Sequence, residues 1–362
     1  MNHKLAEITQ KIYRTYQPMG TPGLALLNSQ AEDQFQNILR DETSHLSDNE
    51  KQRIHDEIFG WGPIETLKSK EDLFDIIIQG PNHIFYETSQ GFTKLNDHFF
   101  SSNSFSNFIE RLCSSGKVLI NQKDPFANTK IDNFRVHMVA PPISKQYQVT
   151  LRKHRNQIIP LENLLETGFI SSKQIKIIRD LIYNKENFLV IGPTGSGKTT
   201  LLNSIIDAFP NNQRAVIIED TDEIITNNKL HSKLVSREIC PPNLNPIFLE
   251  DLLKQSLRMR PDRIVIGEVR GKEAKDLMQA LATGHSGSMG TLHADNPHQA
   301  LIRLEMLIQM GAPQWQIEAI RKLIQLSLQT IVTLKADRQN KGIASISKIT
   351  SLEKFGFLLQ EI

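Results

Sequence analysis

The segment GPTGSGKT at residues 192–199 restricts the possible fold of this chain more than any other part of its sequence. It fits the pattern G-x-x-x-x-G-K-[ST], in which glycines let backbone N–H groups turn toward phosphate oxygens. The apolar run NFLVI precedes the segment, and KTTLLNSIIDAF, a run typical of a helix, follows it. A phosphate cradle needs this context, because the helix N-terminus adds positive potential. The segment therefore predicts a P-loop rather than a glycine turn beside a solvated lysine.

A P-loop predicts ATP and Mg²⁺ as cofactors, with separate tasks for neighbouring residues. Lys198 would hold the β- and γ-phosphates, and the hydroxyl of Thr199 would ligate Mg²⁺. The residues expected to bind the nucleotide are Gly192, Pro193, Thr194, Gly195, Ser196, Gly197, Lys198, Thr199 and Thr200.

Strand-like and helix-like runs alternate after Ser172, which is typical of a parallel sheet with crossover helices. Helices are expected to begin near Lys198, Leu249, Lys272 and His298. Strands are expected over 188–191, 215–219, 263–267 and 288–293. The second half therefore predicts an α/β fold, a RecA-like P-loop NTPase domain with a mainly parallel sheet.

The first half has a different pattern, and 362 residues exceed the size at which one hydrophobic core usually keeps growing. Short β-like runs over 74–100 and 134–153, with a helix-like stretch at 103–114 between them, indicate a smaller α+β domain. The expected organisation is a helical segment over 1–60, an α+β domain over 61–153, a linker over 154–165 and the ATPase domain over 166–362.

Hydrolysis also needs a carboxylate for the attacking water and another acceptor for the metal. Glu219 ends one predicted strand, Glu268 follows the next, and His293 ends a third. Strand C-termini meet at the ligand-binding edge of a doubly wound sheet, so all three are candidate catalytic residues. Glu219 is assigned to the water, with Asp220 and Glu223 as neighbours that could share this task. The alternative for all three is a polar strand end that only meets solvent.

The second carboxylate motif departs from the usual pattern, because Gly267 stands where an aspartate associated with the metal is expected. Glu268 is assigned to the metal together with Thr199, and the roles of Glu219 and Glu268 could also be reversed. Arginines commonly meet the charge of the γ-phosphate in the transition state. The candidates are Arg135 and Arg152 in the first half and Arg258, Arg260 and Arg270 in the second, although surface solvation is the ordinary role of each.

Composition excludes several other classes of protein. The net charge of +2 and the lack of a basic strip with aromatic residues argue against a nucleic-acid partner. Cys113 and Cys240 lack metal-site spacing, which favours a reducing compartment. The longest apolar runs fall far below the ~18–20 residues that span a bilayer, so no transmembrane segment is expected. These features predict a cytoplasmic protein whose attachment to a membrane would be peripheral.

The assembled motifs resemble those of the type II/type IV secretion ATPases, and among these the CpaF/TadA subfamily, which drives assembly of tight-adherence pili. The resemblance runs from about Gly60 to about Leu334. It is carried by GWGPIETL, DIIIQGPNHIFYE, RVHMVAPPIS and VTLRKH in the first half, and by GPTGSGKTTLLNSI, VIIEDTDEI, LRMRPDRIVIGEVRG and ATGHSGSMGTLHADNP in the second. The glycine before Glu268 is itself a feature of that family. Residues 1–50 and the tail after Asp337 match only weakly.

The resemblance implies a homohexameric ring with nucleotide held between the two domains of a subunit, near a neighbour. It implies that Arg135 and Arg152 approach the phosphates, and that an inner-membrane platform protein is the partner. The expected function is an ATPase motor for pilus assembly or protein secretion at the inner face of the cytoplasmic membrane. The alternatives are a nucleotide-binding scaffold without hydrolysis and a RecA-like motor that moves nucleic acid.

Overall fold

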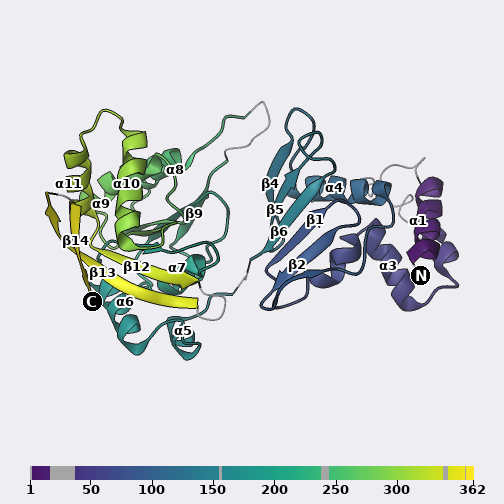
Figure 1. The fold of residues 1–362 in the computed structure, drawn as a ribbon, viewed down its shortest axis with the longest axis horizontal. Coiled ribbons are helices and arrows are strands. Elements are labelled where there is room, and N and C mark those ends of the chain that lie inside the picture. The colour runs from purple at the N-terminus through teal and green to yellow at the C-terminus, as the bar shows by residue number, and fades with distance from the viewer. Residues whose placement is uncertain (1, 17–36, 155–156, 238–243, 337–340, 355) are drawn as a thin grey trace. The chain divides into compact units, whose positions relative to one another are not determined.

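The structure is a computed structural model, and its chain divides into two compact units, Met1–Arg155 and Asn156–Ile362 (Figure 1). The residues that the structure describes are 2–16, 37–154, 157–237, 244–336, 341–354 and 356–362. Cys240 lies outside them. No helix of these ranges combines the length and the apolar character that crossing a bilayer requires.

The first unit contains α1 (Asn2–Tyr16), α3 (Asp48–Ile58), η2 (Gly62–Leu67), β1 (Asp75–Gln79), β2 (Ile84–Thr88), β3 (Gly91–Lys94), α4 (Ser102–Gly116), β4 (Phe126–Ile131), β5 (Phe134–Val139) and β6 (Gln148–Lys153). Its six strands form an antiparallel sheet in the order β3-β2-β1-β6-β5-β4. Alternate strand residues such as Ile76, Val136 and Leu151 form a core with Phe105 and Phe108 of α4. The expected smaller α+β domain is confirmed.

The second unit contains α5 (Leu161–Glu166), α6 (Ser172–Tyr183), β7 (Phe188–Ile191), α7 (Lys198–Asp207), β8 (Ala215–Glu219), β9 (Ser232–Val235), α8 (Leu249–Ser256), β10 (Arg263–Ile266), α9 (Glu273–Ala282), β11 (Met289–Leu292), α10 (Pro297–Gly311), α11 (Ile317–Ser327), β12 (Thr330–Ala336), β13 (Lys341–Glu353) and β14 (Gly356–Glu361). The eight strands have the order β14-β13-β12-β7-β11-β10-β8-β9. From β12 to β9 all neighbours are parallel, and β13 and β14 extend the sheet antiparallel. The four predicted strands are confirmed to within one residue.

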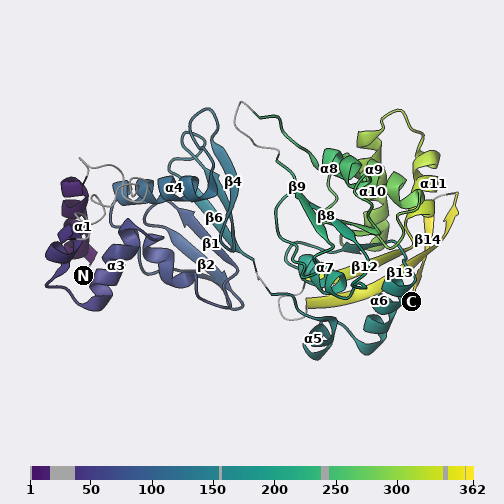
Figure 2. The same ribbon diagram turned by 180° about the vertical axis from the view of Figure 1, so that it is seen from behind.

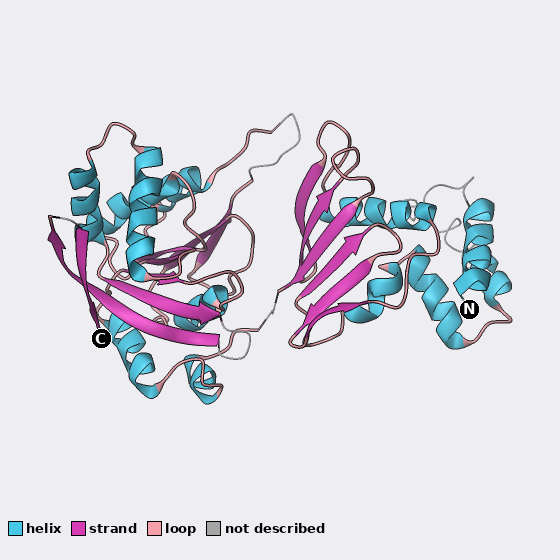
Figure 3. Ribbon diagram, viewed as in Figure 1, coloured by secondary structure: helices cyan, strands magenta, loops and turns pink. Residues whose placement is uncertain are grey.

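Helices cover both faces of this sheet, which makes the second unit a three-layer RecA-like domain (Figures 2 and 3). Along β7, Leu189 and Ile191 pack with residues of α8 to α11, whereas Phe188 and Val190 pack with residues of α5 to α7. Because successive strand residues point to opposite faces, a strand covered on both sides must be apolar throughout. The continuous run FLVI meets this requirement, and the predicted fold class is confirmed.

Residues 154–165, expected to be a linker, include the start of a packed helix. In α5, Leu161 and Leu164 are buried in the core that α6 and α7 share. The hydroxyl of Ser204 on α7 also donates a hydrogen bond to the carbonyl oxygen of Ile159. The proline at 160 serves as the N-cap of α5, so the residue that suggested a linker marks the beginning of a helix.

Candidate functional site

The P-loop connects the C-terminal end of β7 to the first turn of α7, as the motif predicts. Gly195 and Gly197 have φ angles of +75° and +94°, in the left-handed region that favours glycine. A Cβ atom at Gly195 would meet nothing within 4 Å, so this side of the loop is open. A Cβ atom at Gly192 would lie 2.7 Å from Oγ of Ser196 and 3.0 Å from Cβ of Leu334. The loop is therefore closed toward the protein and open where a phosphate would approach.

Lys198 is held by its own loop. Its Nζ atom donates to the carbonyl oxygens of Gly192 at 2.8 Å and Pro193 at 3.0 Å. Burial lowers the pKa of Lys198, and the nearby carboxylate of Glu268 opposes this shift. Ser196 is fully buried, and among the described residues its hydroxyl oxygen has no hydrogen-bond partner. The P-loop thus holds a partly desolvated cation beside an unsatisfied hydroxyl, a combination that suits an anionic ligand.

Glu219 ends β8 and its side chain is only 2% exposed. Its Oε1 atom accepts hydrogen bonds from the backbone N–H groups of Ile224 at 2.7 Å and Glu223 at 3.0 Å. Its Oε2 atom lies 3.6 Å from Nζ of Lys233. Burial raises the pKa of the Glu219 carboxyl, and the two N–H groups and Lys233 act in the opposite direction. One carboxylate oxygen is therefore occupied by the following loop, and the other lacks a hydrogen bond within the described part of the chain.

Gly267 makes room for the side chain of Glu219. A Cβ atom at position 267 would lie 3.1 Å from Cγ of Glu219, closer than most such contacts in proteins. The two residues are neighbours because Ile218 pairs with Ile266 across β8 and β10. An aspartate at position 267 would compete with Glu219 for this space. The departure from the usual motif therefore has a steric reason.

Glu268 is more accessible than Glu219, with a side chain 36% exposed. Its Oε2 atom lies 3.9 Å from Nε of Arg270, and Arg270 also forms an ion pair with Asp220. Arg270 therefore contacts one carboxylate from the segment that follows β8 and one from the segment that follows β10. Glu268 follows β10, whose C-terminal end lies at the same edge of the sheet as those of β11 and β7, so the register places this carboxylate at the P-loop edge.

His293 follows β11 directly, and the register places it at the same edge of the sheet. Leu292 pairs with Ile191, the last residue of β7 before the P-loop. The edge therefore brings together the P-loop, Glu219, Glu268 and His293, as the strand-end argument predicts for these elements.

Arg135 and Arg152 lie opposite each other on β5 and β6 of the first unit. Lys130 of β4 is the cross-strand partner of Arg135, so three basic residues form a row on the face away from the core. Arg152 forms a bidentate ion pair with Asp75 of β1, with N–O distances of 2.9 and 3.3 Å. Like charges in directly opposed positions repel each other, and a nearby carboxylate or a bound anion offsets this repulsion. Sequence reasoning identified both arginines and missed Lys130, because β4 was not predicted.

Arg258 and Arg260 are exposed in the segment after α8. Among the described residues neither forms an ion pair with the P-loop edge, so their part in the site rests on sequence alone.

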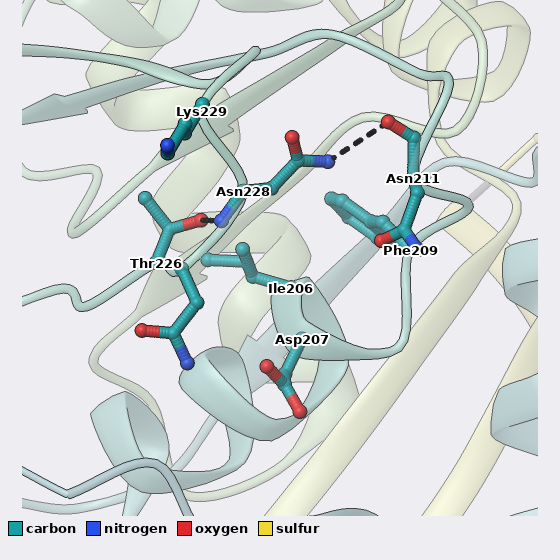
Figure 4. A pocket seen from close by; sticks show the side chains of 8 residues that line it. Ile206, Asp207, Phe209, Asn211, Thr226, Asn228 and Lys229 are labelled. Atoms are coloured by element: carbon teal, nitrogen blue, oxygen red, sulfur yellow. Dashed lines mark hydrogen bonds between the residues drawn. The ribbon is translucent and has the colours of Figure 1, made fainter.

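A cavity of about 340 Å³ lies at the C-terminal end of α7, the end opposite to the P-loop (Figure 4). In it, Asn228 donates a side-chain hydrogen bond to the carbonyl oxygen of Asn211, and its backbone N–H donates to Oγ1 of Thr226. None of the predicted site residues lines it. This cavity is therefore separate from the candidate nucleotide site.

Comparison with known proteins agrees with this geometry. A family model described as "Type II/IV secretion system protein" matches residues 60–352. A Mycobacterium tuberculosis protein named for conjugal transfer is 30% identical over 309 residues, covering 83% of this chain and 87% of that protein. The type IV secretion system protein VirB11 of Bartonella henselae is 28% identical over 312 residues, covering 75% and 87%. A crystal structure of the pilus retraction motor PilT with bound ADP has a TM-score of 0.55 at 20% identity, covering 83% and 81%.

Proposed function

The chain belongs to the type II/IV secretion system protein family, and from this premise we propose that it is a motor that hydrolyses Mg-ATP. The work done would be assembly of a Tad-like type IV pilus or secretion of protein across the inner membrane. In this proposal the protein acts in the cytoplasm, at the inner face of the cytoplasmic membrane, on a platform protein of that membrane. The absence of a spanning helix in the described ranges is compatible with such peripheral attachment.

The observation that supports hydrolysis best is the gathering of different functional groups at one edge of the sheet. Four strands, β7, β8, β10 and β11, end there in the P-loop, Glu219, Glu268 and His293. A protein that only binds nucleotide needs the P-loop, but it does not need two carboxylates beside it. This arrangement favours an ATPase over a scaffold.

The residues present suit Mg²⁺ bound together with a nucleotide. In the described ranges, no group of three or more His, Cys, Asp or Glu side chains could hold a metal ion alone. Mg²⁺ does not need one, because it is usually held by one or two protein ligands, substrate phosphates and water. Thr199 in the first turn of α7 and Glu268, which follows β10 at the same edge of the sheet, would supply the protein ligands. When bound, the ion would neutralise charge that develops on the phosphate oxygens.

The chain's own groups would then act in sequence. Lys198 would exchange the carbonyl oxygens of Gly192 and Pro193 for the β- and γ-phosphates. Glu219 would orient the attacking water through Oε2 and accept its proton, a task that suits a carboxyl whose pKa burial raises. His293, which follows β11 at the same edge of the sheet, would be a further hydrogen-bonding group of the site.

This function is tested by measuring phosphate release from ATP by the purified full-length protein, with Mg²⁺ or with EDTA, and with or without single-stranded DNA. We expect release that requires Mg²⁺ and does not increase with DNA. Release that DNA stimulates strongly would favour a nucleic-acid motor instead, and binding of ATP without any release would favour a scaffold.

The first unit is expected to contribute to catalysis. If the row of Lys130, Arg135 and Arg152 meets phosphate charge, Arg135→Ala and Arg152→Ala should each slow turnover by about 10²-fold or more. The matched control is Lys94→Ala, which removes an exposed lysine from β3 at the far edge of the same sheet. Steady-state ATPase assays of the three variants decide the point. Turnover like that of the unsubstituted protein in both arginine variants would leave these residues as ordinary solvated side chains.

The protein is expected to form a ring, most simply a homohexamer, because the family resemblance implies that a neighbour completes each site. Multi-angle light scattering at micromolar protein, with a non-hydrolysable ATP analogue and Mg²⁺, measures the assembly mass directly. A mass of six chains is the expected result. A monomer under all these conditions would contradict the ring.

A further inference from the structure

Lys233 lies on β9, the edge strand next to β8, and its ammonium group faces three acceptors. It donates hydrogen bonds to Oδ1 of Asp222 and to the carbonyl oxygen of Ile224. Its third neighbour is Oε2 of Glu219, at 3.6 Å. Two of the three donors of the ammonium group therefore bond to the turn, and its contact with Glu219 is an ion pair rather than a hydrogen bond.

These contacts connect Lys233, Ile224 and Glu219 in a ring of polar interactions. The N–H of Ile224 donates to Oε1 of Glu219, while the carbonyl oxygen of the same residue accepts from Lys233. Lys233 in turn faces the other carboxylate oxygen of Glu219. On the side of β10, Gly267 leaves just enough space for Cγ of Glu219. The position of the carboxylate therefore depends on both the turn after β8 and the lysine of β9.

Charge gives the lysine a second effect on the same carboxylate. Glu219 is almost completely buried, and Lys233 is the cation that offsets the cost of burying its charge. Asp222, on the same turn, repels the carboxylate and itself pairs with Lys233. A neutral side chain at position 233 would leave Glu219 and Asp222 to repel each other without this cation.

A lysine on an edge strand often only prevents another strand from pairing with that edge. That role needs a charged group in solvent, and it does not need the acceptors that Lys233 contacts. The Lys233 side chain is only 30% exposed, and its Nζ atom is directed to the turn. The contacts therefore favour a role in the site.

We propose that Lys233 is a positioning residue. It fixes the turn over residues 219–224 and thereby holds Oε2 of Glu219 in place for the attacking water. This inference rests on the proposed ATPase function. Lys233 does not contact the P-loop residues in the described structure, so it should affect the chemical step rather than nucleotide binding.

The test compares Lys233→Met, which keeps the length of the side chain, and Lys233→Arg, which keeps the charge, in the full-length protein. Lys229→Met, at an exposed lysine four positions earlier, is the matched control. Two properties are measured: kcat and KM for ATP, and the exchange of backbone amide hydrogens with deuterium over residues 219–226 without nucleotide. The second measurement does not require activity.

For Lys233→Met we expect kcat to fall about tenfold or more while KM changes less than about threefold. Amide exchange at Glu223 and Ile224 should become faster, since their acceptor on Glu219 is no longer fixed. Lys233→Arg should restore much of kcat, and Lys229→Met should behave as the unsubstituted protein.

A kcat for Lys233→Met equal to that of the unsubstituted protein would overturn the proposal and leave the ATPase function intact. A raised KM with unchanged kcat would also overturn it, since this would place the lysine in nucleotide binding. If the unsubstituted protein releases no phosphate, the ATPase function fails by itself. Amide exchange then still decides whether Lys233 fixes the turn.

Discussion

Replacing Lys198 by alanine is expected to reduce Mg²⁺-dependent ATP hydrolysis by about 10³-fold, to the background of the assay. The ammonium group lies in a partly buried loop, where charge is poorly screened, so its loss leaves the β- and γ-phosphate charge uncompensated. Phosphate release under saturating ATP measures the effect.

The fold should survive this substitution, because the hydrogen bonds of Lys198 within the described ranges go to carbonyl oxygens of its own loop. Circular dichroism and the thermal midpoint of unfolding serve as controls for structure. Normal turnover by a correctly folded Lys198→Ala protein would disprove the P-loop assignment and with it the proposed motor.

The second large effect on ATP hydrolysis is expected when either carboxylate is replaced. The variants Glu219→Gln and Glu268→Gln distinguish the role of one carboxylate from that of the other. If Glu219 orients the water and accepts its proton, the glutamine variant should slow the chemical step by roughly 10²-fold or more, with nucleotide binding nearly unchanged. The side-chain carbonyl oxygen of glutamine can still accept hydrogen bonds from the backbone N–H groups of Glu223 and Ile224, so the turn should persist. Single-turnover kinetics and analogue binding measure the two quantities.

Glu268→Gln should instead weaken the Mg²⁺ dependence of both binding and turnover, because a hard cation loses a charged ligand in the ground state too. Titrating Mg²⁺ against analogue affinity and against turnover in both variants compares the roles directly. If the Mg²⁺ midpoint shifts for Glu219→Gln and not for Glu268→Gln, the two roles are reversed.

The strands of the second unit could be predicted where the sheet is covered on both faces. FLVI, AVII and IVI are continuous apolar runs within β7, β8 and β10 because both faces of these strands are buried. β4 and β9 were missed because their residues alternate between buried or half-buried and exposed positions, so polar residues interrupt each short run. The tail after Asp337 was matched only loosely, yet β13 and β14 continue the sheet beyond β12.

The geometry of the candidate site could be predicted where it follows local sequence, as in the P-loop, and where it follows strand ends, as for Glu219. The role of Gly267 could not, because it depends on a side chain from the neighbouring strand β8. Lys233 was missed for the same reason. Its acceptors belong to the turn after β8, and nothing in SKLV indicates that the lysine folds back toward Glu219.

The strand order also determines when the proposed nucleotide site can form during synthesis. β7 lies between β11 and β12, which begin at residues 289 and 330, far beyond β7 in the chain. On a ribosome, the strand that carries the P-loop therefore emerges long before either of its neighbours. Closing such long loops is entropically costly, and parallel pairing between distant segments is slow. The nascent chain must keep this apolar strand from misassociating until almost the whole polypeptide has been made.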